Sequence, residues 1–581
     1  MTGKGQEFVD IGYQIMWTRL TAVVEEQAKS LIRTAFSATV SEAGDLSAGI
    51  FDIQGRMIAQ AVTGTPGHVN SMAEAVKHFI ATFPVETMRD GDHFITNDPW
   101  LSSGHLHDIT VVTPTFHQGK IVALFACCCH QVDIGGLGHG PDGKSIYEEG
   151  LFIPIMYLAR QGELNQDLLG LIAANVRQPY QVEGDIMSYM ASNEAGGRHL
   201  VQMLTEFPDI PLADLSSFIL ARSKQAVIRQ IKDLPNGIYK SSITVDGYDQ
   251  PVTLKAAITI EDERIIVDFD GSASASKFGI NLVMNYTLAY SAYGVRAAIA
   301  GDIPNNAGSL EPIVVLAPEG SILNVQKPAP VCARHIIGQF LPDLVLGCLD
   351  QVPGVSVPAE GSSALWGVQM RGGPEVAEAV DAASNRTPPE PFDLLFFNSG
   401  GTGARANLDG LSATGFPSGV RALPVEAVEN NAPIVIWKKE LRPGSGGAGK
   451  WRGGLGQTVE VGTVDQSDFA VFAMFDRVDN PARGRANGLQ GAAGSVSTRN
   501  GKPLRSKGKQ IIAGDDRLII EIPGGGGTGS PFERELARID DDLVAGIIDR
   551  KEASDLYGVI FADDGTIDQT ATEKARRDRQ E

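Results

Sequence analysis

The chain has 581 residues, a mass of 61.8 kDa and a formal net charge of −21 at neutral pH. An acidic balance of this size argues against nucleic acid and anionic membrane surfaces as partners, because both repel negative charge. The sequence has no uncharged apolar run of roughly 18 residues and no signal-peptide core. Its five cysteines form no disulfide framework. We therefore expect a soluble, reduced, cytoplasmic protein.

The chain begins with a predicted helix and a predicted hairpin. Apolar side chains between residues 8 and 36 recur near helical spacing, which predicts one long amphipathic helix. Residues 46–60 contain two short strands around Gln54 and Gly55. Asp45 stands just ahead of the first strand, where it could serve as a ligand, although its local sequence favours a simple turn residue.

Histidines gather in the stretch from Asp92 to His139. Six of the ten histidines of the chain fall inside it, together with several aspartates. Imidazole and carboxylate groups at short spacing in a Gly-rich setting are typical of a metal site. The alternative is that these side chains only cap strand ends and hydrogen-bond a loop. We favour the metal site, because so many imidazoles without a charge partner would otherwise be unexplained.

Two apolar runs inside this stretch predict a second hairpin. Residues 109–116 and 121–129 read as antiparallel strands joined by a turn at Gln118 and Gly119. Residues whose numbers sum to 237 then face each other, so that His107 lies opposite His130 and Asp108 opposite Cys129. Paired antiparallel residues have Cα atoms about 4.5 to 5.5 Å apart. We expect the open end of the hairpin to collect His105, His107, Asp108, His130 and Asp133.

Only some of these side chains can bind one ion directly. His105 and Asp108 are three residues apart, and they reach the same side only if the chain turns before the strand begins. Residues 102–104 (Ser-Ser-Gly) favour such a turn. Two histidines and one carboxylate with an open position suit a catalytic Zn²⁺, Mn²⁺ or Fe²⁺.

Residues 138–145 match the phosphate-binding pattern GxxxxGK[ST] letter for letter. That loop needs a strand before it and a helix that begins at its lysine, here Lys144, so that backbone N–H groups meet the phosphates. Gly150 and Pro154 interrupt the segment that follows and disfavour this helix. We therefore interpret the match as chance and expect no ATP site here.

A second Gly-rich segment, residues 523–529, follows a predicted strand over residues 518–522. Ser530 and Glu533 then have capping-box spacing, with Pro531 at the first helical position, so the glycine loop is expected to open a helix. A helix N-terminus can hold an anion such as a phosphoryl group. A sharp corner without a ligand is the favoured interpretation.

The remaining patterns complete an α+β chain. Helices are predicted over residues 69–83, 161–176, 212–232 and 285–300, and residues 178–185 are predicted as a turn into a further long helix that ends at about Leu204. Strands are predicted over residues 237–246, 252–260, 264–269 and 433–437. We expect a multi-domain mixed α/β fold, with an N-terminal helix and β-hairpin metal domain and a β-rich, Gly-rich C-terminal part. The expected divisions are residues 1–232 (metal-binding α+β domain), 233–327 (β-rich domain), 328–410 (mixed α/β segment), 411–562 (β-rich, Gly-rich domain) and 563–581 (charged tail).

Several motifs in chain order resemble those of the hydantoinase B/oxoprolinase family. They are residues 97–100 (NDPW), 104–108 (GHLHD), 130–136 (HQVDIGG), 149–151 (EGL), 445–454 (SGGAGKWRGG) and 523–527 (PGGGG). The family includes the B subunits of N-methylhydantoinases and caprolactamases, and related subunits of acetone and acetophenone carboxylases. The resemblance covers nearly the whole chain.

The resemblance implies one divalent metal, Zn²⁺ or Mn²⁺ ahead of Fe²⁺. The matching ligand positions are His105, Asp108 and His130, with Asp45 as the fourth, which raises Asp45 above its local interpretation. The chain departs from the family pattern where the second histidine of a His-His pair is Gln131, which puts a two-metal site in doubt.

The resemblance also implies a partner and a reaction. The partner is an A-type subunit of actin-like architecture that binds ATP with Mg²⁺ and phosphorylates the carbonyl oxygen of a small cyclic amide, in an A2B2 hetero-tetramer. The metal would supply a water whose pKa is lowered toward roughly 7. Asp133 or His107 would orient that water or act as the base. A subunit of an ATP-dependent ketone carboxylase is the first alternative, and a non-catalytic scaffold subunit is the second.

Overall fold

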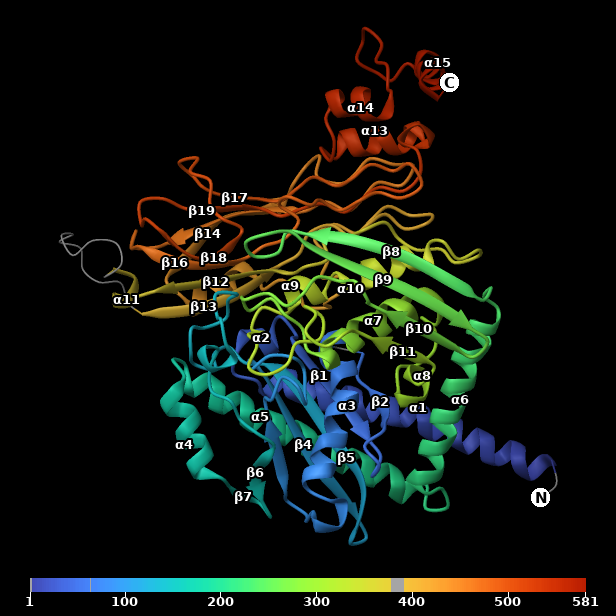
Figure 1. Ribbon diagram of the computed structural model, residues 1–581, viewed down its shortest axis with the longest axis vertical. Helices are drawn as coiled ribbons and strands as arrows, with labels where there is room; N and C mark the ends of the chain where they lie inside the picture. The colour runs from blue at the N-terminus through green and yellow to red at the C-terminus, as the bar shows by residue number, and fades with distance from the viewer. Residues whose placement is uncertain (1–2, 63, 378–390, 581) are drawn as a thin grey trace. The chain divides into compact units, whose positions relative to one another are not determined.

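The computed structural model describes residues 3–62, 64–377 and 391–580. Contacts within the chain divide it into two compact units. Unit 1 comprises Met1–Ile243, Thr253–Val355 and Pro417–Leu423, and unit 2 comprises Thr244–Val252, Ser356–Phe416 and Pro424–Glu581. Each unit mixes helices and sheets (Figure 1), which confirms the α+β, multi-domain class. The finer division into four parts and a tail stays a prediction.

Up to Leu349 the larger elements are α1 (Gly3–Thr34), α2 (Ala38–Ser41), β1 (Leu46–Phe51), β2 (Met57–Gln60), α3 (Pro66–Thr82), β3 (His93–Thr96), β4 (Asp108–His117), β5 (Lys120–His130), β6 (Met156–Arg160), β7 (Glu163–Leu164), α4 (Gln166–Asn175), α5 (Pro179–Glu206), α6 (Leu212–Lys232), β8 (Gly237–Val245), β9 (Val252–Glu261), β10 (Arg264–Asp268), α7 (Met284–Ile299), α8 (Ala307–Leu310), β11 (Ile313–Leu316), α9 (His335–Gly338) and α10 (Leu341–Leu349). The helices and strands predicted in this part of the chain are confirmed, with two differences. Residues 178–185 were predicted as a turn, but α5 already begins at Pro179. The segment predicted as a helix over residues 161–176 begins instead with the short strand β7, and α4 starts only after Asn165, whose side chain caps it.

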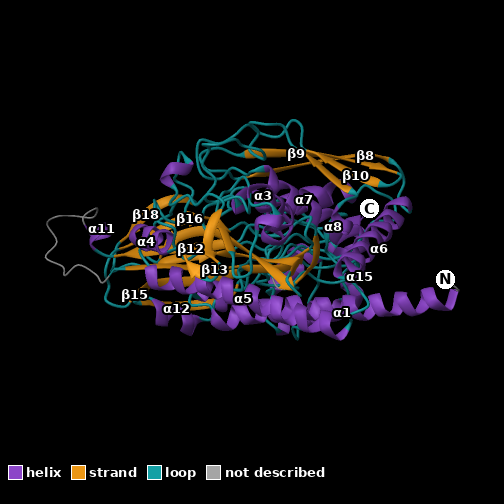
Figure 2. Ribbon diagram, turned by 90° about the horizontal axis from the view of Figure 1, so that it is seen from below, coloured by secondary structure: helices purple, strands orange, loops and turns teal. Residues whose placement is uncertain are grey.

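A seven-stranded antiparallel sheet in the order β2-β1-β5-β4-β3-β6-β7 forms the centre of unit 1. Helices cover both of its faces, which explains why β5 is apolar along most of its length. Ala123 and Phe125 pack with α1, α5 and α6, whereas Leu124, Ala126 and Cys128 pack with α3 on the opposite face. Figure 2 shows α1 and α5 running together along one side.

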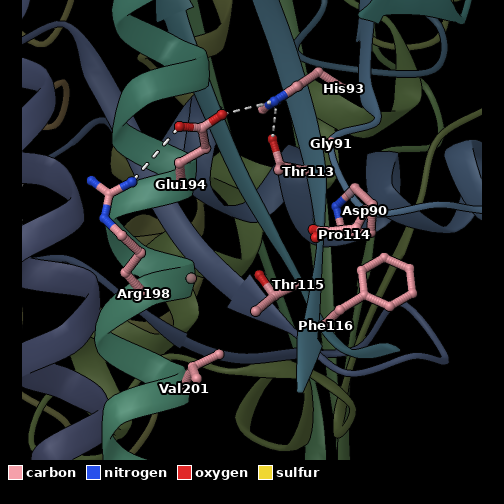
Figure 3. Close-up of a pocket in the computed structure, with 11 residues that line it drawn as sticks. Asp90, Gly91, His93, Thr113, Pro114, Thr115, Phe116, Glu194, Arg198 and Val201 are labelled. Atoms are coloured by element: carbon pink, nitrogen blue, oxygen red, sulfur yellow. Dashed lines mark hydrogen bonds and ion pairs between the residues drawn. The ribbon is translucent and has the colours of Figure 1, made fainter. Parts of the chain in front are cut away.

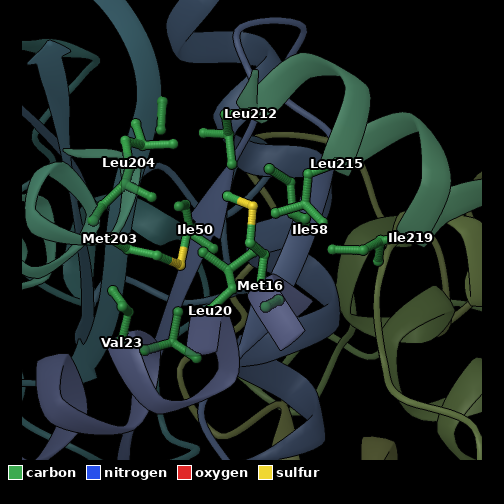
Figure 4. Close-up of a cluster of buried hydrophobic side chains, with 14 of the residues drawn as sticks. Met16, Leu20, Val23, Ile50, Ile58, Met203, Leu204, Leu212, Leu215 and Ile219 are labelled. Atoms are coloured by element: carbon green, nitrogen blue, oxygen red, sulfur yellow. The ribbon is translucent and has the colours of Figure 1, made fainter. Parts of the chain in front are cut away.

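The first of these two cores joins segments that are distant in the sequence. Met16 and Leu20 of α1 meet Ile50 of β1, Met203 of α5 and Leu215 of α6, and all five are buried (Figure 4). Burying a side chain of this size contributes about 1.5–3 kcal/mol. The cluster therefore holds the two long helices against the sheet.

The hairpin of β4 and β5 turns at Gln118 and Gly119, as predicted, but its predicted register is wrong beyond the turn. Thr115 pairs with Ala123 and Phe116 with Ile121, so Val122 is an extra residue in β5. A bulge of this kind shifts every later pair by one residue. Asp108 consequently faces His130, rather than Cys129. His107 lies just outside the strand, where its carbonyl accepts from the Gln131 N–H.

The segment with the phosphate-loop pattern does not have the fold that such a loop needs. Residues 138–145 form bends and irregular loop, and the segment that follows directly has a single 3-10 turn, Ile146–Glu148, in place of a helix. The predicted interruption of the helix after Lys144 is confirmed.

The later elements are β12 (Trp366–Gly372), α11 (Pro374–Ala377), β13 (Phe392–Asn398), α12 (Val425–Asn431), β14 (Ile434–Leu441), β15 (Gln457–Thr463), β16 (Phe469–Met474), β17 (Ser495–Thr498), β18 (Lys507–Ile512), β19 (Leu518–Glu521), α13 (Leu536–Val544), α14 (Arg550–Tyr557) and α15 (Gln569–Gln580). In unit 2 the strands form two four-stranded sheets, in the orders β13-β12-β16-β18 and β14-β15-β19-β17. This confirms a β-rich C-terminal part.

Glycines in unit 2 allow backbone segments to lie directly against one another. The Gly525 N–H donates to the Gly454 carbonyl, the Gly526 N–H to Glu360 and the Gly527 N–H to Leu489. A Cβ added at any of these glycines would meet a backbone carbonyl at a distance that real side chains do not adopt. Close backbone approach, and not a special φ angle, is therefore the reason for glycine here.

The same bonds correct the interpretation of residues 523–529 as a loop in front of a helix. The glycine N–H groups are already used within the chain, and the loop leads to a single 3-10 turn, Pro531–Glu533. Ser530 accepts from the Phe532 N–H, one position earlier than in a capping box, and α13 starts only at Leu536. These N–H groups are not available to an anion.

Replacing Gly525 by Ala should destabilise unit 2, because the added methyl group would overlap the Thr402 carbonyl. Overpacking of this kind costs about 1–3 kcal/mol. Gly170→Ala is the control, since that helical glycine in α4 has open space around it and should gain about 0.4–1 kcal/mol. Thermal unfolding of both variants measures the difference. Equal midpoints for the two variants would contradict the packing argument.

Candidate metal centre

Asp108, the first residue of β4, is the centre of a buried cluster in unit 1. Its Oδ1 atom lies 2.7 Å from His105 Nε2 and 3.1 Å from His130 Nδ1. The turn over residues 102–104 brings His105 back over the strand, as predicted, and the hairpin pairing supplies His130. The ligand atoms of these three side chains lie within 4.8 Å of one another, and all three residues are buried.

The second carboxylate oxygen of Asp108 is held by a separate set of groups. Oδ2 pairs with the Arg334 guanidinium, accepts from Ser103 Oγ at 2.6 Å and lies 2.9 Å from His68 Nε2. Arg334 also donates to the Ser103 carbonyl and lies over the Tyr286 ring, 4.1 Å from its centroid. The carboxylate is therefore fixed in orientation, with Oδ1 turned toward His105 and His130.

The hydrogen bonds of His105 determine which ring nitrogen carries its proton. Nδ1 lies 2.8 Å from the Cys332 carbonyl, which can only accept, so Nδ1 must be protonated. In the neutral ring, Nε2 then carries a lone pair that points toward Asp108 Oδ1, and the two atoms lie 2.7 Å apart. Two acceptors at this distance repel each other unless a proton or a cation lies between them.

The pKa values favour a cation over a proton. Burial, followed by the charge of Arg334, lowers the pKa of His105 to about 3, in spite of the nearby Asp108. Burial would raise the pKa of Asp108, but His105, His68 and Arg334 hold it well below its usual value. The two shifts point toward an uncharged imidazole beside an ionised carboxylate, which is the protonation state that metal ligands need.

Further imidazoles surround this cluster. The rings of His107 and His139 lie 5.0 Å apart, the ring of His107 stacks 5.5 Å from that of His130, and His139 stacks 5.7 Å from His335. His107 Nε2 and both ring nitrogens of His139 are buried without a hydrogen-bond partner among the described residues. Burial lowers the pKa of both rings well below the usual value, so both are neutral.

These features fit a divalent ion held by His105, Asp108 and His130. Two imidazoles and a carboxylate are a donor set for Zn²⁺, Mn²⁺ or Fe²⁺. A buried polar atom without a partner costs about 1–3 kcal/mol, and an ion or a bound ligand beside His107 and His139 would offset that cost. The set His68, Asp108 and Cys128 is also compact, but there Arg334 already neutralises the carboxylate oxygen.

Asp45 and Asp133 have other surroundings than the three central residues. Asp45 Oδ1 lies 3.6 Å from His68 Nδ1, which connects it to Asp108 through the His68 ring. Both oxygens of Asp133 accept from Arg177, and Oδ1 also accepts from the Gly135 N–H at 2.9 Å. Asp133 therefore fixes the Gly-rich turn after His130. The role of Asp45 as a fourth metal ligand stays a prediction. So does the role of Asp133 in orienting the water or acting as the base.

Two histidines of the predicted cluster lie elsewhere. His117 is at the tip of the hairpin, at the opposite end of β4 from Asp108. His93 lines a separate pocket of about 340 Å³ between α5 and β4, where its Nδ1 lies 2.8 Å from Thr113 Oγ1 and its Nε2 3.2 Å from Glu194 (Figure 3). The histidine-rich stretch of the sequence therefore contains the site, but not every histidine in it belongs to the site.

The sequence patterns missed the groups that come from outside the hairpin, His68 at the start of α3 and Arg334 just before α9. Residues 331–337 (Val-Cys-Ala-Arg-His-Ile-Ile) did carry one signal. A lone arginine in an apolar run is buried only when a carboxylate pairs with it.

Comparison with known proteins identifies the family. The hydantoinase B/oxoprolinase model matches residues 10–531. The chain belongs to this family. It is 30% identical over 97% of its length to an uncharacterized protein of Methanocaldococcus jannaschii, of which it covers 99%. It is 27% identical over 96% of its length to the caprolactamase subunit beta of Pseudomonas jessenii, of which it covers 97%.

Two other relatives extend the comparison. The chain is 28% identical over 88% of its length to the 5-oxoprolinase of Dictyostelium discoideum, and it spans 39% of that longer protein. The crystal structure of the ATP-dependent caprolactamase from Pseudomonas jessenii superposes with a TM-score of 0.85 at 25% identity, covering 98% of this chain and 99% of that one.

A structure of acetone carboxylase shares the fold at 19% identity. Its TM-score is 0.83, over 100% of this chain and 84% of that one. This family member therefore has the fold of both a caprolactamase and a carboxylase. None of its described helices is long and apolar enough to cross a membrane.

His93 should make the metal-free chain less stable as the pH falls. Burial lowers the pKa of His93, although Glu194 opposes the shift. Between that lowered pKa and about 6.5 the unfolded chain binds more protons than the folded chain, so the free energy of unfolding falls with falling pH. His105, His107 and His139 act in the same direction, whereas His68 and Glu149, whose pKa values are raised, act in the opposite direction.

His93→Gln should make the loss shallower by up to about 1.4 kcal/mol per pH unit, because glutamine does not titrate. Urea unfolding of both proteins in the presence of a chelator, between about pH 7.5 and 5.5, spans the range in which a histidine of ordinary pKa titrates. The argument fails if the variant shows the same dependence of stability on pH as the wild type.

Proposed function

We propose that the chain is the metal-bearing B-type subunit of an ATP-dependent enzyme that opens small cyclic amides such as hydantoins, lactams or oxoproline. The observation that carries the proposal is the pair of lone pairs, on His105 Nε2 and Asp108 Oδ1, that converge at 2.7 Å beside the rings of His107, His130 and His139. The relatives named as a caprolactamase subunit and a 5-oxoprolinase support the choice of reaction.

His105, Asp108 and His130 would hold one Zn²⁺ or Mn²⁺, with Fe²⁺ as the less favoured ion. A divalent ion there would lower the pKa of a coordinated water and polarise a carbonyl or phosphoryl oxygen. Arg334 and His68 keep the carboxylate ionised and oriented. Asp45 would act through His68 or join the ion as a fourth ligand.

Two imidazoles of the cluster are suited to proton transfer. His107 and His139 are neutral at physiological pH because burial lowers their pKa values, and each has at least one ring nitrogen without a partner among the described residues. A neutral imidazole with a free lone pair can accept a proton from an attacking water. Asp133, through Arg177, would keep the Gly135–Gly136 turn beside His130 in place.

The activated substrate would come from an ATP-binding A-type subunit. Phosphorylation of the ring carbonyl oxygen by that partner breaks the amide resonance and creates a good leaving group. The segment of this chain with the phosphate-loop pattern lacks the following helix, which is consistent with ATP and Mg²⁺ being held by the partner. We propose an A2B2 assembly in the cytoplasm, where the five buried thiols would stay reduced.

The proposed role of the three ligands predicts the loss of both metal and activity. Ala at His105, Asp108 or His130 should lower the metal content of the purified complex below a tenth of an equivalent. Product formation should fall by at least about 100-fold, because the two remaining ligands cannot replace the missing donor. His117→Ala is the matched control at the other end of the hairpin and should retain both. Turnover that survives in the three variants would refute the metal role, and metal-free but active wild type would favour the scaffold alternative.

A ketone carboxylase is the second candidate, and the shared fold with acetone carboxylase favours it. Co-expression with the proposed A-type partner subunit, followed by an assay of ADP release, distinguishes the two reactions. We expect ADP release with a cyclic amide and without bicarbonate. ADP release that requires a ketone together with bicarbonate would contradict the amidohydrolase and assign the carboxylase.

A further inference from the structure

A buried carboxyl group, Glu149, holds the backbone that touches the metal centre. Glu149 follows the 3-10 turn Ile146–Glu148 and is 2% exposed. Its Oε1 accepts from the N–H groups of Val331 and Cys332, at 2.8 and 2.9 Å. Burial raises its pKa to about 8, in spite of these bonds. Burying a carboxyl group costs free energy, and its hydrogen bonds must offset that cost.

Those contacts continue directly to a predicted ligand. Glu149 accepts from the N–H of Cys332, and the carbonyl of the same residue accepts from His105 Nδ1 at 2.8 Å. The bond to this carbonyl keeps the proton on Nδ1 and turns Nε2 toward Asp108. One side chain therefore sets the position of the acceptor that fixes the ring of His105.

The surroundings of Glu149 are shaped to keep it in one place. A Cβ at Gly143 would lie 3.1 Å from Glu149 Cγ, and a Cβ at Gly279 would lie 3.0 Å from Oε1. The Ala333 N–H donates to the Gly279 carbonyl, so the segment that packs against Glu149 also holds the residue after Cys332. Oε2 is buried and has no hydrogen-bond partner among the described residues, so Oε1 makes all the bonds that orient the group.

We propose that Glu149 is a positioning residue for the metal centre, which acts through the Cys332 peptide to hold His105 in the ring orientation and tautomer that an ion needs. Groups that hydrogen-bond a ligating histidine are worth about 10- to 100-fold in metal affinity when removed. Glu149 does not bond His105 itself. It acts on His105 through the backbone of Cys332, whose carbonyl is the acceptor. The inference rests on the proposed function, since it assumes that His105 is a ligand.

The experiment compares two substitutions of similar volume in the full-length chain. Glu149→Gln keeps an oxygen that can accept from Val331 and Cys332, whereas Glu149→Leu leaves both N–H groups without an acceptor. Glu148→Ala is the matched control, because that neighbouring carboxylate is exposed and accepts from the Lys144 N–H at 3.1 Å. Each metal-free protein is titrated with Co²⁺ alone, and the visible absorption gives both the affinity and the geometry of the site.

Glu149→Leu should bind Co²⁺ at least about 10-fold more weakly than the wild type, with an altered absorption spectrum, because the His105 ring loses its fixed acceptor. Glu149→Gln and Glu148→Ala should bind within about 3-fold of the wild type and keep its spectrum. A purely structural role would lower the unfolding midpoint of Glu149→Leu without changing the spectrum.

The outcomes separate the inference from the function on which it rests. A wild-type chain that binds no Co²⁺ overturns the metal centre itself. A wild type that binds, beside a folded Glu149→Leu that binds equally well, overturns only the role of Glu149. If Glu149→Leu does not fold, Glu149→Gln decides, because weakened binding or a changed spectrum in that folded variant contradicts a role that needs only the acceptor oxygen.

Discussion

Two lone pairs pointing at each other in a dry interior are unstable by themselves, and the buried cluster of unit 1 is built around such a contact. Asp108 stays ionised because Arg334 and His68 occupy one of its oxygens. His105 stays neutral because burial disfavours its charge, and its one N–H, on Nδ1, donates to the Cys332 carbonyl. A divalent cation where the two lone pairs meet would remove the repulsion. The geometry of the hairpin, the turn before it and the Cys332 loop all serve this one contact.

The sheet supplies the rigidity that this arrangement needs. Apolar side chains on both faces of β4 and β5 pack against helices, so the ends of the two strands cannot separate without exposing both cores. The bulge at Val122 has a direct chemical consequence, since it moves His130 opposite Asp108. In unit 2 a different constraint applies, where glycines let backbone segments lie in contact and use their own N–H groups.

Local patterns were enough to predict the hairpin and the identity of its polar residues. Alternation, turn residues and the spacing of His105 and Asp108 all act within a few positions along the chain. The register was wrong because a bulge leaves no mark in a run as uniform as residues 121–129. Arg334 and His68 could not be assigned, because they reach Asp108 from segments that only the tertiary fold brings near. The family resemblance contributed the choice among ligands, which the residues alone left open.

Anomalous X-ray scattering from crystals of the metal-loaded chain tests the central claim most directly. The account predicts one peak about 2.0–2.2 Å from His105 Nε2, Asp108 Oδ1 and His130, the usual distance for nitrogen and oxygen ligands. The same cluster without an anomalous peak, in crystals of protein exposed to the metal, would contradict it.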